Sequence, residues 1–170
     1  MPFSLLPKVI FPATTDVTPS YLHGKNIRLL MLDFDNTVVP YTTDTPTGAM
    51  EAWIRQMRSS PVKLCVVSNS KRDRVKHFCD SYGLPCITHA KKPFSRGIAQ
   101  CLNRFEASAS ACALVGDQIF TDTLGANCAG LTSILVTPID NHNFWLKARH
   151  VLEMPFIYLA RKRRIENEES

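Results

Sequence analysis

The stretch "IRLLMLDFDNT", residues 27–37, decides the fold, because an apolar run ends there at two aspartates, Asp33 and Asp35, separated by one residue. An apolar run of this length is typical of a strand that is covered on both faces of a parallel sheet. Aspartate and asparagine are common turn residues, so a turn after the strand is the first interpretation of the two carboxylates. A catalytic site that binds a metal ion is the second.

The rest of the chain alternates strands with helices. Further apolar runs predict strands over 62–69, 85–88, 111–117 and 132–138. The segments between these strands are expected to form helices, over 46–59, 70–83, 91–105 and 121–130. This alternation indicates an α/β fold with a parallel sheet.

Local signals predict where three of the helices begin. Thr45 is a candidate N-cap with Pro46 at the first helical position, which is the place where proline is best tolerated. Ser70 and Asp73 have the spacing of a capping signal before the second helix. Pro93 is expected to open the third helix.

A chain of 170 residues is long enough for one domain with its own core. We expect an N-terminal lead segment over 1–25, a catalytic core over 26–138 and a basic, helical C-terminal segment over 139–170. The C-terminal segment is predicted to be one helix, or a pair of helices with a break at Pro155. It could pack on the edge of the sheet as an ordinary helix, or it could lie against a membrane surface.

Charge and cysteine content narrow the classes of partner and compartment. The net charge of +5 favours an anionic partner or substrate. The basic C-terminal part lacks aromatic residues at the spacing that base stacking requires, so no stable nucleic-acid partner is expected. Six cysteines without a CxxC motif indicate a reducing compartment. Three prolines interrupt the apolar N-terminus, so we expect neither a signal peptide nor a transmembrane span.

Polar residues follow four of the predicted strands. In open α/β sheets ligands bind beyond the carboxyl ends of the strands, so these residues are expected to lie together. They are Asp33 and Asp35, Ser68 and Asn69, Lys91 and Lys92, and Asp117 followed by Asp122.

The residue types in this set fit phosphoryl transfer. Residues i and i+2 of an extended segment point to the same side, so Asp33 and Asp35 can converge. Together with Asp117 they repel one another unless a hard divalent cation neutralises them, and oxygen ligands favour Mg²⁺. One aspartate is then free to act as nucleophile and another to transfer the proton of the leaving group. Ser68, Asn69 and a lysine ammonium would hold the phosphoryl oxygens.

Four short motifs, "DFDNT", "SN", "KKP" and "GDQIFTD", occur in this order and resemble those of the haloacid dehalogenase (HAD) superfamily, subclass IIIA. The resemblance implies a Rossmann-like three-layer sandwich with a five-stranded parallel sheet in the order 5-4-1-2-3. Only 32 residues separate Asp35 from Ser68, and only 23 separate Ser68 from Lys92. These intervals leave no room for the cap domain that many members of the superfamily carry.

The resemblance also implies a role for each residue of the motifs. Asp33 matches the nucleophile and Asp35 the general acid/base. Thr37 matches a residue that supports the nucleophile loop, and we place it with the phosphate-binding residues. That group is Thr37, Ser68, Asn69 and Lys92, and Lys92 fits its position better than Lys91 because it directly precedes Pro93.

The same resemblance implies the ligands of Mg²⁺. They are Asp33, the backbone carbonyl of Asp35, and Asp117. Asp122 matches the second acid of the last motif and is expected to support the site.

Over nearly its whole length the chain resembles the YqeG type of these phosphatases, which is similar to the phosphatidylglycerophosphate phosphatases. The resemblance implies hydrolysis of phosphatidylglycerophosphate to phosphatidylglycerol through an aspartyl-phosphate, by a cytoplasmic protein that is peripheral at the inner membrane face. A mitochondrial matrix location is the alternative. Two other functions stay open: a capless phosphatase of soluble small molecules or nucleic-acid ends, and an inactive module that binds phosphate.

Overall fold

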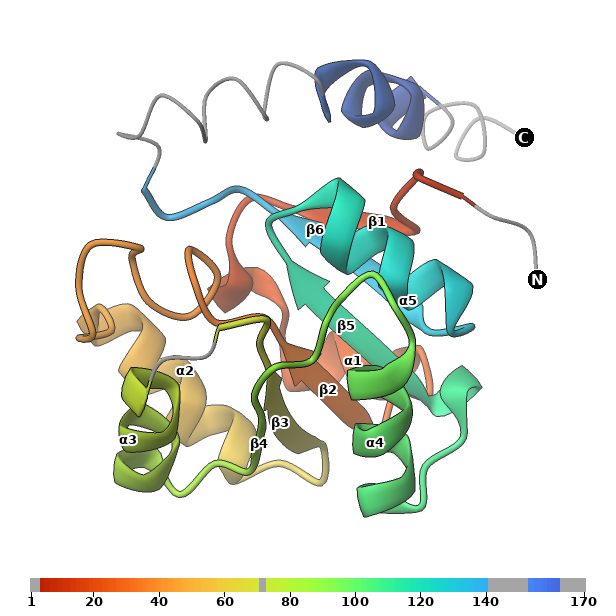
Figure 1. Cartoon of the computed structure of the whole chain (residues 1–170). Helices are drawn as coiled ribbons and strands as arrows, with labels where there is room; N and C mark the ends of the chain where they lie inside the picture. The colour runs from red at the N-terminus through yellow and green to blue at the C-terminus, as the bar shows by residue number, and fades with distance from the viewer. Residues whose placement is uncertain (1–3, 71–72, 141–152, 163–170) are drawn as a thin grey trace.

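The computed structural model describes residues 4–70, 73–140 and 153–162, and its centre is a six-stranded, fully parallel sheet in the order β1-β6-β5-β2-β3-β4 (Figure 1). Helices cover both faces of this sheet. The strands are β1 Val9–Phe11, β2 Leu29–Leu32, β3 Lys63–Val67, β4 Cys86–Ile87, β5 Cys112–Gly116 and β6 Thr132–Val136.

The helices that surround the sheet are short to medium in length. The α-helices are α1 Pro19–Gly24, α2 Gly48–Arg58, α3 Asp73–Tyr82, α4 Arg96–Phe105 and α5 Leu124–Cys128. The shorter turns of helix are η1 Thr14–Asp16, η2 Ala109–Ala111 and the π-helical η3 Ile119–Thr123. Residues 153–162 are also helical.

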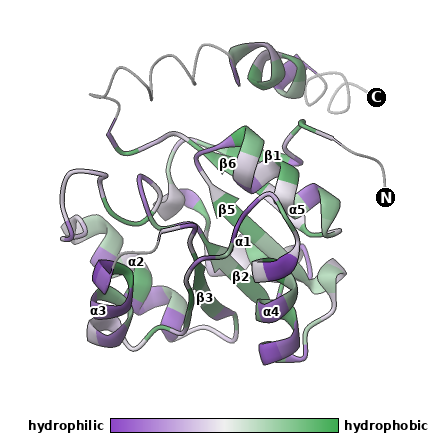
Figure 2. Cartoon of the chain, viewed as in Figure 1, coloured by the Kyte–Doolittle hydropathy of each residue, from purple (hydrophilic) through white to green (hydrophobic). Residues whose placement is uncertain are grey.

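Alternating side chains of the central strand build two separate cores. Leu30 and Leu32 of β2 pack in the core that α1, α2 and α3 cover. Leu29 and Met31 point to the other face and pack in the core under α4 and α5. Both faces of β2 are therefore buried, and its sequence is apolar throughout, as Figure 2 shows for the central strands.

The predicted α/β fold with a parallel sheet is confirmed. The five predicted strands are β2 to β6, and they lie in the predicted order. The expected number of five strands is wrong, because β1 in the lead segment adds a sixth, with Val9 opposite Ile134 of β6. Pro7 and Pro12 flank β1, and proline next to a short edge strand removes no hydrogen bond from the interior of the sheet.

Two predicted helix starts are corrected by the structure. α2 begins at Gly48, and its N-cap is Thr47 rather than Thr45, because the Thr47 hydroxyl accepts a hydrogen bond from the backbone N–H of Met50 at 3.2 Å. α4 begins at Arg96, three residues after Pro93. α3 begins at Asp73, and the preceding residues 71–72 lie outside the described chain.

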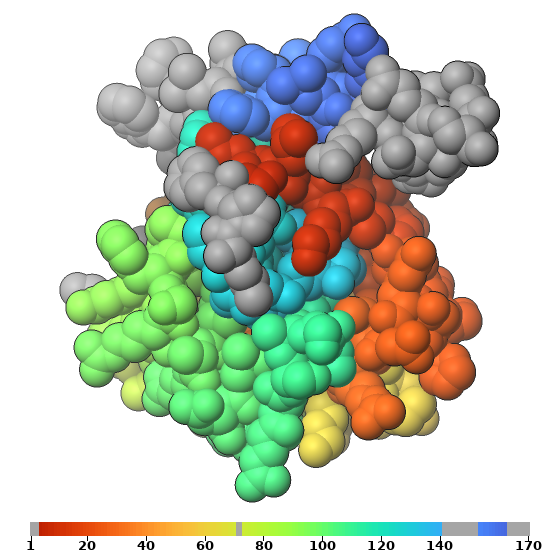
Figure 3. Space-filling model, turned by 90° about the vertical axis from the view of Figure 1, so that its right-hand side faces the viewer, coloured from red at the N-terminus to blue at the C-terminus, as the bar shows by residue number. Residues whose placement is uncertain are grey.

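The C-terminal helical residues 153–162 contact η3. The ring of Phe156 meets that of Phe120 edge to face, with centroids 6.1 Å apart. Figure 3 shows this segment in blue at the same end of the molecule as the N-terminal segment in red. Pro155 lies within the helical residues, so it does not break a helix there. The remaining parts of the predicted segment, 141–152 and 163–170, lie outside the described residues.

The segments between the motifs contain no cap domain in the part of the chain that the structure describes. Between β2 and β3 the chain forms α2, and between β3 and β4 it forms α3. No helix among the described residues is both long and apolar enough to cross a membrane.

Candidate active site

The loop that follows β2 is a turn and also the centre of the site. The backbone N–H of Asp33 donates to the carbonyl of Val115, which continues the pairing of β2 with β5. Asn36 then takes a left-handed conformation, with φ of 62°, which asparagine tolerates better than most residues. Its side-chain oxygen accepts the N–H of Tyr41 at 3.0 Å. The turn predicted from these residues is therefore present, and it fixes the direction of the carboxylates.

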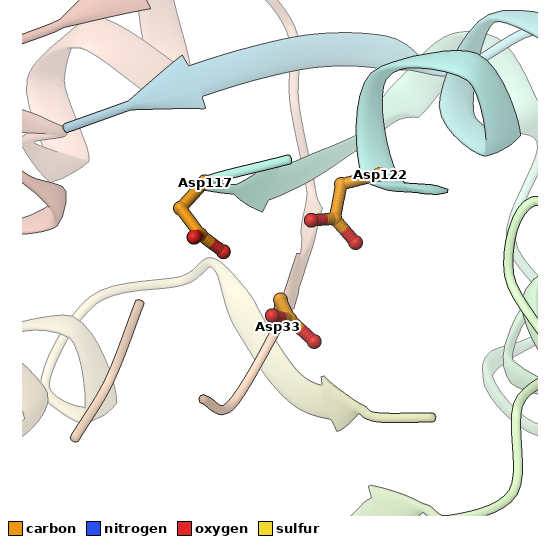
Figure 4. Close-up of side chains that lie close together, drawn as sticks. All are labelled: Asp33, Asp117 and Asp122. Atoms are coloured by element: carbon orange, nitrogen blue, oxygen red, sulfur yellow. The ribbon is translucent and has the colours of Figure 1, made fainter. Parts of the chain in front are cut away.

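Three buried carboxylates and one buried ammonium form the inner cluster, which consists of Asp33, Asp117, Asp122 and Lys92. Oxygen atoms of the three aspartates lie within 4.8 Å of one another and point toward a common centre (Figure 4). The Lys92 Nζ atom is 2.6 Å from Oδ1 of Asp33 and 2.7 Å from Oδ1 of Asp122. The aspartates come from the ends of β2 and β5 and from η3, so the topology of the sheet brings them together.

Negative charge is in excess in the inner cluster. Burial raises the pKa of Asp122 to about 6, although the neighbouring Lys92 ammonium acts in the opposite direction and Asp33 adds to the rise. Burial alone would lower the pKa of Lys92, but the carboxylates of Asp122 and Asp33 raise it above its usual value. Lys92 therefore stays charged, and its ammonium contacts two of the three acids, Asp33 and Asp122.

A glycine at the end of β5 makes room for Asp122. A Cβ atom at Gly116 would lie 2.4 Å from Cγ of Asp122, which is closer than two such atoms can come. The backbone N–H of Gln118 donates to Oδ2 of the same carboxylate at 3.2 Å. Any side chain at position 116 would therefore push Asp122 away from Lys92.

Ser68 and Asn69 lie on the wall of the cavity in front of the inner cluster, together with Asp33, Asp35 and Lys92. The Ser68 hydroxyl is fully buried and accepts the N–H of Ser70 at 3.1 Å. The side-chain amide of Asn69 donates to the carbonyl of Lys92 at 2.9 Å and accepts its N–H at 2.7 Å. Asn69 thus holds the backbone of Lys92.

The side chains of two residues from the predicted motifs, Thr37 and Lys91, do not line the cavity. Thr37 is fully buried and does not line the cavity, so the structure does not bring it to a phosphate group. Its backbone carbonyl accepts a hydrogen bond from the hydroxyl of Thr14 at 2.9 Å, which anchors the loop from behind. Lys91 is exposed, and it is the ammonium of Lys92 that reaches the carboxylates.

An ion pair at the outer side of the cavity involves a residue that the motifs do not contain. Nη2 of Arg74 is 2.5 Å from Oδ1 of Asp35, and Nη1 is 3.2 Å from Oδ1 of Asp44. We call Asp35, Arg74 and Asp44 the rim group. Arg74 lies in the first turn of the helix that follows Ser68 and Asn69, and no motif or spacing in the sequence indicates its contact with Asp35.

Glu153 is a second residue that the sequence interpretation missed. Its carboxylate is buried and accepts the backbone N–H of Ile119 at 2.9 Å. Ile119 is the first residue of η3, which lies between Asp117 and Asp122. The C-terminal helical segment therefore helps to fix the part of the chain that carries two of the three acids.

The donor set of the inner cluster fits a hard divalent cation. Carboxylate oxygens are the ligands that Mg²⁺ prefers, and the surplus of negative charge over the Lys92 ammonium is what a divalent ion would neutralise. Asp33, Asp117 and Asp122 could hold such an ion together, and Lys92 contacts one oxygen each of Asp33 and Asp122.

The comparison with protein families decides the relationship of the chain. The family model described as "Mitochondrial PGP phosphatase" matches residues 1–139. The chain belongs to the mitochondrial PGP phosphatase family. Membership confirms that it is a phosphatase of the HAD superfamily, as its four motifs predicted. A relative from Bacillus subtilis (strain 168), described as "Probable phosphatase YqeG", is 32% identical over 155 residues, which is 90% of each chain.

Solved structures support the fold of this member of the PGP phosphatase family. The cobalt-bound form of deoxy-D-mannose-octulosonate 8-phosphate phosphatase from Haemophilus influenzae superposes with a TM-score of 0.54 at 13% identity, covering 76% of this chain and 89% of that one. An uncharacterised protein from Listeria monocytogenes gives a TM-score of 0.56 at 16% identity, covering 69% and 84% of the two chains. At these identities the similarity shows the fold.

Proposed function

We propose that this protein is a Mg²⁺-dependent phosphomonoester hydrolase that converts phosphatidylglycerophosphate to phosphatidylglycerol. The observation that carries the proposal is the inner cluster, in which Asp33, Asp117 and Asp122 converge around Lys92 at the wall of a polar cavity. Such a cluster combines a nucleophile, a cation and a metal-binding donor set in one small volume. The family of the chain supplies the substrate class.

The residues divide the reaction between them. Asp33 attacks the phosphorus atom through a carboxylate oxygen, the bond to the leaving oxygen breaks, and an aspartyl-phosphate forms. Asp35 gives a proton to the leaving oxygen and later takes one from the water that hydrolyses the aspartyl-phosphate. Ser68 and Lys92 stabilise the equatorial oxygens of the phosphoryl group, and Asn69 acts by holding Lys92 in place.

When bound, Mg²⁺ supplies positive charge beside the phosphoryl oxygens. We propose Asp33, the backbone carbonyl of Asp35, and Asp117 as its protein ligands, with Asp122 in a supporting position. The cobalt-bound state of the Haemophilus influenzae phosphatase, which has the same fold, supports a divalent metal at a site of this kind.

Exposed apolar and basic side chains support work at a membrane surface. Arg161 and Lys162 are exposed on the C-terminal helical segment. Large apolar side chains are exposed on this segment and on the loops next to the site, at Phe94, Phe120, Met154, Tyr158 and Leu159. Each basic residue near an anionic bilayer contributes about 1 kcal/mol to binding. We propose a peripheral location at the inner face of the cytoplasmic membrane, or at the matrix face in mitochondria.

A panel of phosphorylated substrates tests the function. With Mg²⁺, the purified protein should release phosphate from phosphatidylglycerophosphate in anionic vesicles faster than from glycerol 3-phosphate, sugar phosphates or nucleotides. Asp33→Asn should lower the rate by a factor of about 10³ or more, because the nucleophile is lost. Release from soluble substrates alone would instead support a general phosphatase, and phosphate binding without release would support an inactive module.

Sedimentation with vesicles tests the membrane surface separately. The protein should pellet with vesicles that contain phosphatidylglycerol and stay in solution with vesicles of phosphatidylcholine alone. Replacing Arg161 and Lys162 with Glu should weaken binding at least tenfold, since two attractive charges become repulsive. Equal binding of both proteins to both vesicles would show that this surface does not face the membrane.

A further inference from the structure

A second cavity, of about 360 Å³, lies next to the active-site cavity, and Arg74 is placed between the two. The active-site cavity is lined by Asp35, which contacts Arg74 through Nη2. Asp44, which contacts Arg74 through Nη1, lines the second cavity. One guanidinium thus joins the wall of one cavity to the wall of the other.

The inner side of Arg74 is held firmly. Its guanidinium carbon lies 5.2 Å from the centre of the Phe34 ring, and Nη1 donates to the backbone carbonyl of Tyr41 at 3.3 Å. The Arg74 side chain is only 11% exposed. Within the described residues its buried Nε–H has no hydrogen-bond partner. These contacts fix the position of the guanidinium and leave donor capacity on it.

The outer partner of Arg74 is easy to displace. Asp44 is 63% exposed, and ion pairs of exposed carboxylates contribute little because water competes for both groups. A phosphate oxygen pair matches the planar fork of a guanidinium and can bind it through two hydrogen bonds. An anionic group that enters the second cavity would therefore replace Asp44 at small cost.

We propose that Arg74 and the second cavity form a subsite for a second anionic group of the substrate, namely the phosphodiester that links the glycerol headgroup to the lipid. This subsite rests on the proposed phosphatase function and defines its substrate as a phosphomonoester with a phosphodiester one glycerol away. Asp44 occupies Nη1 of Arg74 until the phosphodiester replaces it. Phe78, Tyr82 and Pro46 give the cavity an apolar side next to the charged one.

The spacing of the two sites suits such a substrate. Asp33 and Asp35 are separated by one residue, so their Cα atoms lie at most about 7 Å apart. Arg74 contacts the second of these aspartates directly. A glycerol bridge between two phosphorus atoms has a similar reach, so one phosphate can lie at Asp33 while the other meets the guanidinium.

Two soluble substrates that differ in one charge test the subsite. The first is glycerol 3-phosphate with a methyl phosphodiester at its other end, and the second is 1-O-methylglycerol 3-phosphate, which is neutral there. The quantity to compare is the ratio of their kcat/KM values. Because Arg74 also contacts Asp35, its replacement affects both substrates, and the ratio isolates the effect on the phosphodiester.

The expected ratio in the native protein is well above one. Arg74→Met should lower it by about tenfold, the effect of losing a hydrogen bond to a charged group. Arg74→Lys should give an intermediate ratio, because it keeps the charge and loses the fork. Asp44→Asn should raise the ratio about two- to fivefold by removing the competing carboxylate. Asp80→Asn, which removes an exposed acid from the same helix, is the matched control and should leave it unchanged.

The outcomes separate the subsite from the function. A ratio near one in the native protein, or an unchanged ratio in both the Arg74 and the Asp44 variants, would overturn the subsite while the phosphatase activity stands. In that case Arg74 acts only through Asp35. If the native protein hydrolyses none of the three compounds, the two soluble substrates and phosphatidylglycerophosphate, the proposed function and the subsite are both overturned. The Asp44 variants keep the test decisive if replacement of Arg74 prevents folding.

Discussion

The inner cluster and the rim group each pair two aspartates with one cation, at 2.6 and 2.7 Å in the first and at 2.5 and 3.2 Å in the second, yet their environments differ. The Lys92 side chain is 1% exposed, with Asp33 at 8% and Asp122 at 2%. In the rim group, Arg74 is 11% exposed, Asp35 23% and Asp44 63%. The contact distance alone therefore does not predict how much stability is lost when one member of an ion pair is removed. Burial decides it, because a buried charge that loses its partner cannot be solvated by water.

The largest effect is expected at the centre of the inner cluster. Lys92→Met leaves buried carboxylates without the ammonium that contacts two of them, so the free energy of unfolding without metal should fall by about 3–5 kcal/mol. The rate constant kcat should fall by roughly 10²–10³, as a charge that stabilises the transition state is lost. Denaturant unfolding and steady-state kinetics measure the two effects.

Lys91→Met is the matched control for this change. Lys91 is exposed, so its replacement should alter the free energy of unfolding by no more than about 0.5 kcal/mol. An equal decrease of the free energy of unfolding in the two variants would show that the buried contacts of Lys92 do not stabilise the protein.

The catalytic member of the rim group should show an effect that depends on the substrate. Asp35→Asn removes the proton donor, so hydrolysis of an alkyl phosphate should slow by about 10²–10⁴. Hydrolysis of the aspartyl-phosphate needs Asp35 with either substrate, so the comparison is made on the first turnover, in which the aspartyl-phosphate forms. In that step p-nitrophenyl phosphate, whose leaving group needs no proton, should slow much less, and an equal loss for both substrates would mean that Asp35 does not protonate the leaving group.

Binding of Mg²⁺ should depend on the inner cluster and not on Asp44 of the rim group. At about 100 times its dissociation constant, Mg²⁺ should raise the free energy of unfolding by about 2.7 kcal/mol, or the unfolding temperature by roughly 5–10 °C. Asp117→Asn should abolish this shift, because the ion loses one of its three acidic neighbours. Asp44→Asn should keep it. A scan of the unfolding temperature against Mg²⁺ concentration measures both, and loss of the shift in Asp44→Asn would contradict this expectation.

A smaller effect is expected where the C-terminal helical segment meets the inner cluster. Glu153→Ala leaves the buried N–H of Ile119 without its acceptor, which should cost about 1–3 kcal/mol of stability. Glu153→Gln keeps an acceptor oxygen and should cost less. Denaturant unfolding of both variants checks the difference, and equal costs would show that the hydrogen bond to Ile119 is not what Glu153 contributes.

Local patterns were sufficient to predict five of the six strands. The apolar run before Asp33 indicated a strand buried on both faces, and the polar residues after each strand indicated which side chains meet. β1 was missed because prolines on both sides of it obscure a short apolar run. The N-cap of α2 was placed two residues early because Thr45 and Thr47 are equally good caps by residue type.

Arg74 and Glu153 could not be predicted for a different reason. Arg74 is 39 residues from Asp35 in sequence, and Glu153 is 34 residues from Ile119. Both contacts arise from how helices pack around the finished sheet, and no spacing in the chain encodes them. The phosphate-binding role of Thr37 stays a prediction, since its side chain is fully buried and does not line the cavity.

The paired hydrogen bonds of Asn69 have a consequence for comparing relatives of this protein. Its side-chain amide forms hydrogen bonds with both the N–H and the carbonyl of Lys92. These bonds hold two motifs together that are far apart in sequence. An aspartate at position 69 could accept the N–H of Lys92 but could not donate to its carbonyl. We therefore expect positions 69 and 92 to be inherited together. In a related chain where one of the two residues has been replaced, we expect the other to vary as well. Replacement of both residues would then indicate a relative that has lost catalytic activity.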